Sequence, residues 1–250
     1  MRTHIIGVFF GALLAVLLPM SNAGALLVSG DNGINLAATA DFSISGNFLI
    51  ITLSNVAPSG AEVPADVLTG VYFDFLGAPD FAPVSALLNG NVVVQGATPA
   101  DGNVGGEFAY NGNVSGGPGS AQYGISAAGL GIFGGPNFNG PDLETPEAVA
   151  GLNYGIVSSI GAGANTGVTN KPLIQSAVTF TLEYSGSEAL SLEDLSNVWF
   201  QYGTSLTEPS FTGEFPPPPP PPLAPLPEPA TMALLGMGLG GLTLRKMMGK

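Results

Sequence analysis

Carboxylates dominate the residues of this chain that could do chemistry. The sequence has 18 Asp and Glu residues, no cysteine, and a single histidine, His4, close to the N-terminus. Zinc sites with His or Cys ligands, Ser-His-Asp and Cys-His nucleophiles, and haem attachment all need residue types that the rest of the chain lacks. The chemistry left open is that of carboxylates and aromatic rings.

Two pairs of glutamates are the candidates for carboxylate catalysis. Glycoside hydrolysis needs two Asp or Glu side chains about 5 to 10 Å apart across a sugar. The sequence offers Glu144 with Glu147, and Glu183 with Glu193. Nothing in their spacing pairs them in space, and exposed carboxylates are the normal background of an acidic chain. We therefore predict no catalytic residue and no enzymatic activity.

Two aromatic residues, Trp199 and Tyr72, are candidates for contact with sugar rings. Both lie in alternating segments, opposite the face that carries the apolar residues. Packing in the core is the simpler interpretation of Trp199. Asp74 shares the face of Tyr72, and we expect it to be exposed to solvent rather than to bind a ligand or an ion.

Loop acids are the candidates for calcium binding, since carboxylate and amide oxygens are calcium ligands. Asp31, Asp101 and Asp142 lie close to glycine or proline in segments that favour turns. The Asp101-Gly102-Asn103 stretch lacks the spacing of an EF-hand loop, so an ordinary turn is favoured there. We predict no cofactor, with calcium as the open alternative and its ligands unknown.

Short segments with alternating polarity must position these side chains. The period of two that is typical of a strand recurs at residues 49–54, 67–76, 174–184 and 198–202. Asn89-Gly90, between residues 84–88 and 92–95, is typical of a tight hairpin turn. The pattern predicts an all-β fold, most simply a single β-sandwich-like domain.

Glycine is concentrated in the middle of the chain, where residues 96–167 hold 19 of the 37 glycines. We predict long Gly-rich loops there, with brief strands around Phe108 and Tyr123 and at residues 130–133 and 154–157. Thr145-Pro146 resembles a helix start, which Gly151 limits to a turn or two. The glycines follow no nonapeptide repeat, which favours loops over a solenoid.

The N-terminus has the pattern of a secretory signal peptide. Arg2 and His4 precede an apolar run at residues 5–18, and Ser21-Asn22-Ala23 supplies the small residues that signal peptidase requires. We predict cleavage between Ala23 and Gly24, which makes residues 1–23 the signal peptide. Residues 24–213 then form a β-rich extracellular domain.

The C-terminal segment combines three features in a fixed order. Seven prolines at 216–222 lie in a Pro-rich spacer, residues 214–226, and Pro227-Glu228-Pro229 follows. An apolar segment at 230–244 comes next, and Arg245 and Lys246 close it. As a helix this segment would extend about 22 Å, short of the ~30 Å hydrocarbon core of a bilayer. The basic pair would hold its end on the cytoplasmic side.

This order resembles the PEP-CTERM sorting signal of bacterial surface proteins, with the match at Pro227, Glu228 and Pro229 and through the rest of residues 227–250. The resemblance implies that exosortase, a membrane enzyme, recognises the motif and removes the tail, so that the short transmembrane sorting helix is a temporary anchor. Residues 67–74, 152–156 and 198–204 are also similar to segments of a family of exosortase-dependent surface proteins. A permanent C-terminal anchor and a terminal amphipathic or core helix remain the alternatives for the tail.

The net charge and the expected export signals together limit the functions that the protein could have. Seventeen acids against Lys171 give residues 24–227 a net charge of −16, which repels nucleic acid and anionic lipid. We expect signal peptidase and exosortase as partners, a transient stay at the inner membrane, and a final place on the cell surface or outside the cell. The expected function is a non-catalytic surface or extracellular-matrix protein associated with exopolysaccharide. The alternative is a carbohydrate- or calcium-binding adhesion module.

Overall fold

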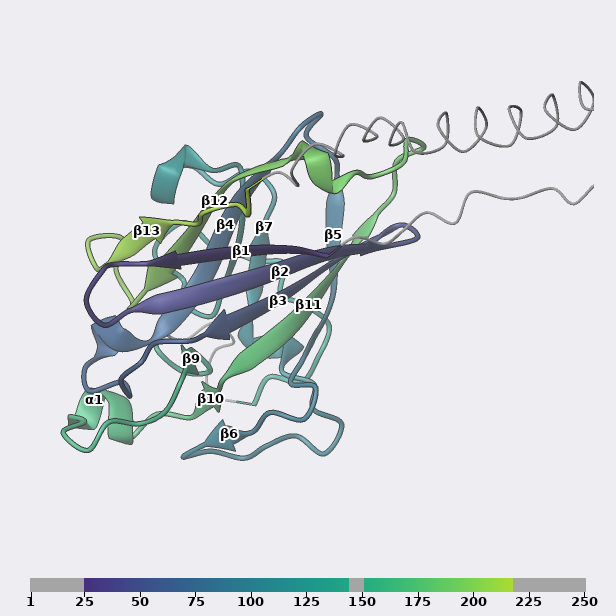
Figure 1. The fold of residues 1–250 in the computed structure, drawn as a ribbon. Coiled ribbons are helices and arrows are strands. Elements are labelled where there is room, and N and C mark those ends of the chain that lie inside the picture. Colours follow the sequence, from purple (N-terminus) through teal and green to yellow (C-terminus); the bar gives the residue numbers. More distant parts are fainter. Residues whose placement is uncertain (1–24, 144–150, 218–250) are drawn as a thin grey trace, which may run out of the picture. The chain divides into compact units, whose positions relative to one another are not determined.

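A computed structural model describes residues 25–143 and 151–217, which form two β-sheets (Figure 1). They belong to one folded unit that ends at Pro216. The all-β prediction is confirmed. The expected signal peptide and the expected sorting segment lie outside the described residues. Within the part of the chain that is described, no helix is long and apolar enough to cross a membrane.

The first sheet has five strands in the order β1-β2-β3-β11-β5, and every neighbouring pair is antiparallel. Its strands are β1 (Leu26–Asp31), β2 (Ala37–Ser45), β3 (Phe48–Asn55), β5 (Phe81–Leu87) and β11 (Ala177–Tyr184). Residues at alternate positions of β2, β3 and β11 are buried, as the alternating sequence predicts. One face of this sheet therefore lies against the core and the other faces outward.

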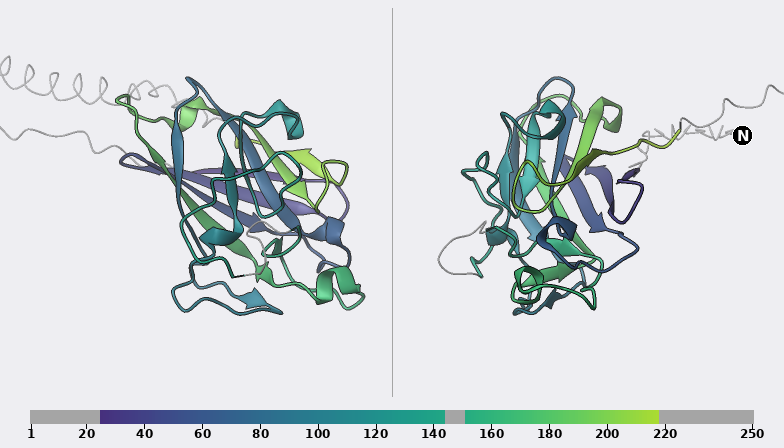
Figure 2. Two further views of the ribbon diagram at one scale, coloured as in Figure 1. Left: turned by 180° about the vertical axis from the view of Figure 1, so that it is seen from behind. Right: turned by 90° about the vertical axis from the view of Figure 1, so that its left-hand side faces the viewer.

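The second sheet has eight strands, with a path β13-β12-β4-β9-β10-β6 and with β8 and β7 added beside β4. Its strands are β4 (Leu68–Phe75), β6 (Val93–Val94), β7 (Ala109–Asn111), β8 (Tyr123–Ser126), β9 (Ile156–Val157), β10 (Leu173–Gln175), β12 (Leu195–Tyr202) and β13 (Ser210–Thr212). The short helices are α1 (Thr166–Thr169), η1 (Pro64–Asp66), η2 (Gly105–Glu107), η3 (Pro118–Ser120) and η4 (Leu192–Asp194). From behind, this sheet and its loops lie in front of the first (Figure 2).

One large apolar cluster lies between the two sheets. Phe42 of β2 meets Phe73 of β4 edge to face, with ring centroids 5.7 Å apart. Phe180 of β11 packs in the same manner on Phe108, at 4.9 Å. These rings come from segments far apart in the sequence, so their packing contributes to holding one sheet against the other.

Two segments that look like single local units in the sequence are divided between the sheets. Ser176, with φ of 78°, separates β10 from β11, so residues 174–184 are two strands in different sheets rather than one. Asn89-Gly90 is a turn, closed by Asn91 N–H to the Leu88 carbonyl at 3.0 Å. Its flanking strands, β5 and β6, pair with β11 and β10, so the predicted hairpin is wrong.

The Gly-rich region forms loops that pack closely on one another. A Cβ on Gly105 would lie 2.2 Å from the carbonyl oxygen of Asn139, and one on Gly106 equally close to that of Pro141. Short strands occur near Phe108 and at Tyr123, as predicted. Residues 130–133 are turns rather than a strand. The expected helix start at Thr145 lies outside the described residues.

Burial of tyrosines predicts an alkaline limit to stability. Burial raises the pKa of Tyr123 from 10.0 to about 12, with smaller contributions from Asp80 and Asp74, and it raises the pKa of Tyr72, Tyr110 and Tyr202 as well. The folded state therefore holds these protons more tightly than the unfolded state. This contribution to stability is complete below pH 10 and is lost as the pH rises toward 12.

We expect the phenolate absorbance and the loss of β-sheet circular dichroism to appear together between about pH 10 and 12. Titration of all tyrosines near pH 10 with an intact circular dichroism spectrum would contradict this expectation.

Candidate functional site

The outer face of the eight-stranded sheet brings together the three residues that the sequence singled out on β4 and β12. Val71, Phe73 and Phe75 point into the core, which turns Tyr72 and Asp74 outward. Trp199 is the register partner of Tyr72 on the neighbouring strand. Trp199 is half-buried on this outer face rather than packed in the core. Alternation alone thus placed all three side chains correctly on one face.

The indole of Trp199 is held by a hydrogen-bond chain that starts at a bulge in β12. The register of β12 against β4 shifts between Ser196 and Trp199, and Asn197 in this bulge has φ of 51°. The Trp199 Nε1 donates to Asn197 Oδ1 at 2.9 Å. In turn, Asn197 Nδ2 donates to Asp74 Oδ2 at 2.8 Å and to the Gly119 carbonyl at 3.1 Å. A β-bulge changes the direction in which a side chain points. In β12 the bulge directs the Asn197 amide toward Trp199, and the amide fixes the orientation of the indole.

Asp74 is the central acceptor of this chain, and the expectation that it is simply exposed to solvent is wrong. It is half-buried, and its Oδ1 accepts the backbone N–H of Gln122 at 2.6 Å while its Oδ2 accepts from Asn197. The carboxylate therefore joins β4, β12 and the loop before β8. A charged acceptor with two donors is a strong hydrogen-bonding group. The Asp74 carboxylate therefore cross-links β4 to β12 and to the loop before β8.

Glycines allow the loop containing η3 to lie directly on the aromatic rings. A Cβ on Gly119, which has φ of 59°, would lie 1.9 Å from Trp199 Nε1. Gly117 lies against Tyr72 in the same manner, and Phe133 covers Tyr72 at a ring distance of 5.9 Å. Tyr72 is fully buried as a result. It is therefore not available as a surface platform for a sugar, and Trp199 is the aromatic candidate that remains partly exposed.

The Asp74→Ala variant tests whether the hydrogen bonds accepted by Asp74 stabilise the fold. The variant leaves the Gln122 N–H and the Asn197 amide without their acceptor, which should lower the free energy of unfolding by about 1–3 kcal/mol. The emission of Trp199, the single tryptophan, should also change, because its partner Asn197 is released. Asp80→Ala, at an exposed position, is the matched control and should change stability by less than about 0.5 kcal/mol. Equal effects of the two variants would contradict the role of Asp74.

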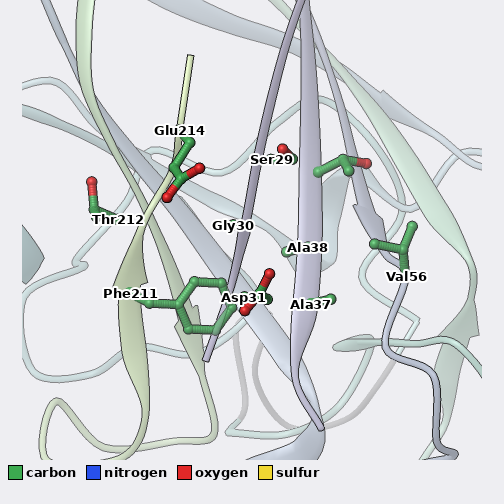
Figure 3. Close-up of a pocket in the computed structure, with 10 residues that line it drawn as sticks. Ser29, Gly30, Asp31, Ala37, Ala38, Val56, Phe211, Thr212 and Glu214 are labelled. Atoms are coloured by element: carbon green, nitrogen blue, oxygen red, sulfur yellow. The ribbon is translucent and has the colours of Figure 1, made fainter. Parts of the chain in front are cut away.

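A pocket of about 240 Å³ lies where β1 passes β13 (Figure 3). Asp31 and Glu214 line it, together with Phe211, Thr212 and the first residues of β2. Ser29 and Glu214 exchange two backbone hydrogen bonds beside it, at 3.2 and 2.6 Å. The pocket therefore marks the point where the two ends of the folded unit meet.

The loop acids proposed for calcium cap turns. Asp31 Oδ1 accepts the N–H of Gly33 at 2.7 Å, and Asp101 Oδ1 accepts that of Asn103 at 3.1 Å. Both are the local turn bonds that Asp commonly makes. Asp142 is exposed. Among the described residues, no three carboxylate, His or Cys side chains gather as a metal site would require.

Of the two proposed carboxylate pairs, the structure describes Glu183 and Glu193, which lie in different elements. Glu183 lies on β11 and accepts a hydrogen bond from Asn47 Nδ2 at 3.3 Å, while Glu193 is exposed in η4. Glu144 and Glu147 lie outside the described residues, as do Ala23, Gly24, the Pro227-Glu228-Pro229 motif, Arg245 and Lys246.

The arrangement around Trp199 offers a partly exposed aromatic ring and polar groups in fixed positions, which are features suited to binding a ligand.

Sequence analysis missed two polar residues of the structure. In the sequence Asn197 is an ordinary polar position of a strand. The one feature that could have indicated the bulge is that Asn tolerates a positive φ. Glu107 is 1% exposed, and its Oε1 accepts the N–H of Leu143. No local pattern distinguishes this glutamate from the exposed ones.

Comparison with known proteins adds no relative, because no family model, curated protein or solved structure matches the chain.

Proposed function

We propose that this protein is exported, is cut near Pro227-Glu228-Pro229 by an exosortase, and serves as a non-catalytic surface or extracellular-matrix protein associated with exopolysaccharide. The observation that carries the proposal is the Ser29–Glu214 backbone bridge. It ties Glu214, two residues before the start of the proline run at 216–222, to the first strand, which begins only two residues after the expected mature N-terminus, Gly24. The described chain thus has its first strand and its last described residues side by side at one edge of the folded unit.

The spacing between the folded unit and the motif supports the processing step. Twelve residues, 215–226, separate Glu214 from Pro227, and eight of them are prolines in or after the run. As polyproline II, at about 3.1 Å per residue, they would extend roughly 37 Å. A membrane enzyme could then reach the motif without contact with the folded unit. Pro227 and Pro229 would keep the backbone at the motif out of a helix.

The described body suits a matrix role. A β-sandwich, the finer description we propose for the two sheets around one core, presents two broad outer faces. The strong negative charge would keep copies dispersed and away from anionic lipid once the tail is cut. In this proposal the tail directs sorting and is then removed, and the folded unit is the mature protein.

A second candidate function, carbohydrate binding, is favoured by the half-buried indole of Trp199. Its orientation is fixed by Asn197 and Asp74 before any ligand arrives, and pre-organised groups lose little entropy on binding. Titration with the polysaccharide of the producing cell, followed by Trp199 emission, separates the two functions. A saturable change supports a binding module, and an unchanged spectrum supports the passive matrix role.

The test of the proposed function is peptide mass spectrometry on the protein recovered from the cell surface and the medium. We expect peptides up to the motif and none beyond Glu228. Recovery of mature protein with an intact C-terminal Lys250 would overturn the processing step.

A further inference from the structure

Four asparagines of this chain are followed directly by glycine, and the structure places them in different surroundings. They are Asn32, Asn89, Asn111 and Asn139. Asparagine is among the residues that are chemically labile on heating. It is most reactive before glycine, because no side chain there shields the backbone nitrogen that can attack its amide. The sequence therefore offers four equivalent candidate sites of modification, and the folded structure distinguishes between them.

Hydrogen bonds hold both reacting groups at Asn32. Its Oδ1 accepts three backbone N–H groups of the same turn, at 3.1, 3.0 and 2.9 Å. The backbone N–H of Gly33, which would have to attack the amide, donates instead to Asp31 Oδ1 at 2.7 Å. These bonds must break before the side chain and the next nitrogen can meet.

Hydrogen bonds also hold the side chain of Asn111, at the end of β7. Its Nδ2 donates to the carbonyl of Ile132 at 2.8 Å, and its Oδ1 accepts the backbone N–H of Asn113 at 2.9 Å. Both polar atoms of this amide are therefore engaged, and its orientation is fixed.

Close packing of the backbone holds Asn139. Its N–H donates to the carbonyl of Val84 at 3.2 Å. A Cβ on Gly140 would lie 2.8 Å from the nitrogen of Gly105, and one on Gly105 would lie 2.2 Å from the Asn139 carbonyl oxygen. The peptide group after Asn139 must rotate to bring the side chain onto the next nitrogen, and this packing opposes the rotation.

Asn89 is free of all these restraints. Asn89 and Gly90 are both exposed at the tip of a turn, with φ of 49° and 93°. In the described part of the chain, neither the Asn89 amide nor the Gly90 N–H makes a hydrogen bond. A Cβ on Gly90 would meet no atom within 4 Å. The reacting groups of this turn can therefore approach each other without breaking any contact of the fold.

We propose that Asn89 is a site of spontaneous deamidation. The backbone nitrogen of Gly90 attacks Asn89 Cγ, and the new bond closes a succinimide ring as the bond from Cγ to Nδ2 breaks. The proton of the attacking nitrogen passes through water to the departing group, which leaves as ammonia. Water then opens the ring at either of its carbonyl carbons. The products are aspartate and isoaspartate, in which the backbone runs through Cβ and Cγ.

The modification adds a negative charge to the turn that carries the chain from β5 to β6, and the fold should survive it. The turn is closed by Asn91, whose N–H and Nδ2 donate to the Leu88 carbonyl at 3.0 and 2.8 Å. The same Nδ2 donates to the carbonyl of Ala177 at 3.1 Å. None of these bonds involves Asn89 or Gly90, so each copy of the protein can be modified while it remains folded.

Peptide mass spectrometry after timed incubation of the protein, in the form that cells export, tests the proposal. Chromatography separates the aspartate and isoaspartate peptides from the original one. We expect conversion at Asn89 to be at least about tenfold faster than at the other three sites, because hydrogen bonds or packing must first be broken there. The rate should rise with pH, since the attacking nitrogen must lose its proton. In urea the four sites should convert at similar rates, because each precedes glycine.

Two variants sharpen the comparison. Asn89→Gln keeps an amide but would have to close a larger ring, so it should stop the loss of ammonia from this turn. Asp31→Ala frees the N–H of Gly33, and it should speed conversion at Asn32 several-fold while the rate at Asn89 stays unchanged. Melting curves show whether each variant is folded, and the comparison of the four sites in the original protein needs no variant.

Equal rates at the four sites of the folded protein would overturn the proposal. So would an unmodified Asn89 in folded protein under conditions in which the urea-unfolded chain converts. The reaction involves no residue of the C-terminal tail, so its outcome is independent of the proposed processing.

Discussion

The Phe180→Ala variant is expected to lose about 3–5 kcal/mol of its free energy of unfolding. Phe180 is fully buried in β11, which pairs with β3 on one side and β5 on the other. Its ring meets Phe108 at 4.9 Å and Phe138 at 5.3 Å, and both partners come from the Gly-rich region. Truncation leaves a cavity where the loops attach to the first sheet. A loss of this size is a large part of the stability of an ordinary domain.

Urea unfolding followed by circular dichroism measures this effect. Ile50→Ala is the control, because Ile50 is half-buried on the outer side of the same sheet, and its truncation should cost about 1 kcal/mol. If Phe180→Ala does not fold, Phe180→Leu keeps most of the volume and should lose less than about 1.5 kcal/mol. Similar losses for Phe180→Ala and Ile50→Ala would show that the rings do not fix the loops.

The strands could be predicted from the sequence because alternation reports directly on burial. Residues 49–54 and 198–202 alternate, and the structure buries every second residue of both, the apolar series that begins at Leu49 and the one that begins at Val198, in one core. The choice of sheet could not be predicted in the same way. Ser176 transfers the chain from one sheet to the other through a single positive φ, which changes neither the periodicity nor the composition. Strand partners depend on contacts between distant residues, which a local pattern does not contain.

The candidate site shows the same division. Alternation placed Tyr72, Asp74 and Trp199 on one outer face, and they do lie there in register. The loop that covers them could not be predicted. It can lie on the rings only because Gly117 and Gly119 have no side chains, which leaves room for Tyr72 and Trp199. Its consequence was large: Tyr72 changed from a surface candidate to a buried ring. Absence of a side chain carries no periodic signal, so sequence reasoning underestimates what Gly-rich segments cover.

Replacing Pro227 and Pro229 together with alanine is expected to abolish removal of the C-terminal tail. The proposed exosortase needs an extended backbone at Glu228, and the two prolines exclude helix there. Alanine, the strongest helix former, would let the helix expected over residues 230–244 extend back through the motif. The variant should then stay in the membrane fraction with Lys250 intact, whereas the original protein is expected at the cell surface or in the medium.

Pro225→Ala, two residues before the motif, is the matched control and should be processed normally, since it alters the spacer but leaves Pro227, Glu228 and Pro229 unchanged. Deleting four of the seven prolines shortens the spacer by about 12 Å and should slow processing without preventing it. If the double variant loses its tail at the normal rate, the motif is not what the protease recognises. If no form ever loses its tail, the segment is a permanent anchor, and the acidic body remains at the membrane that it was expected to leave.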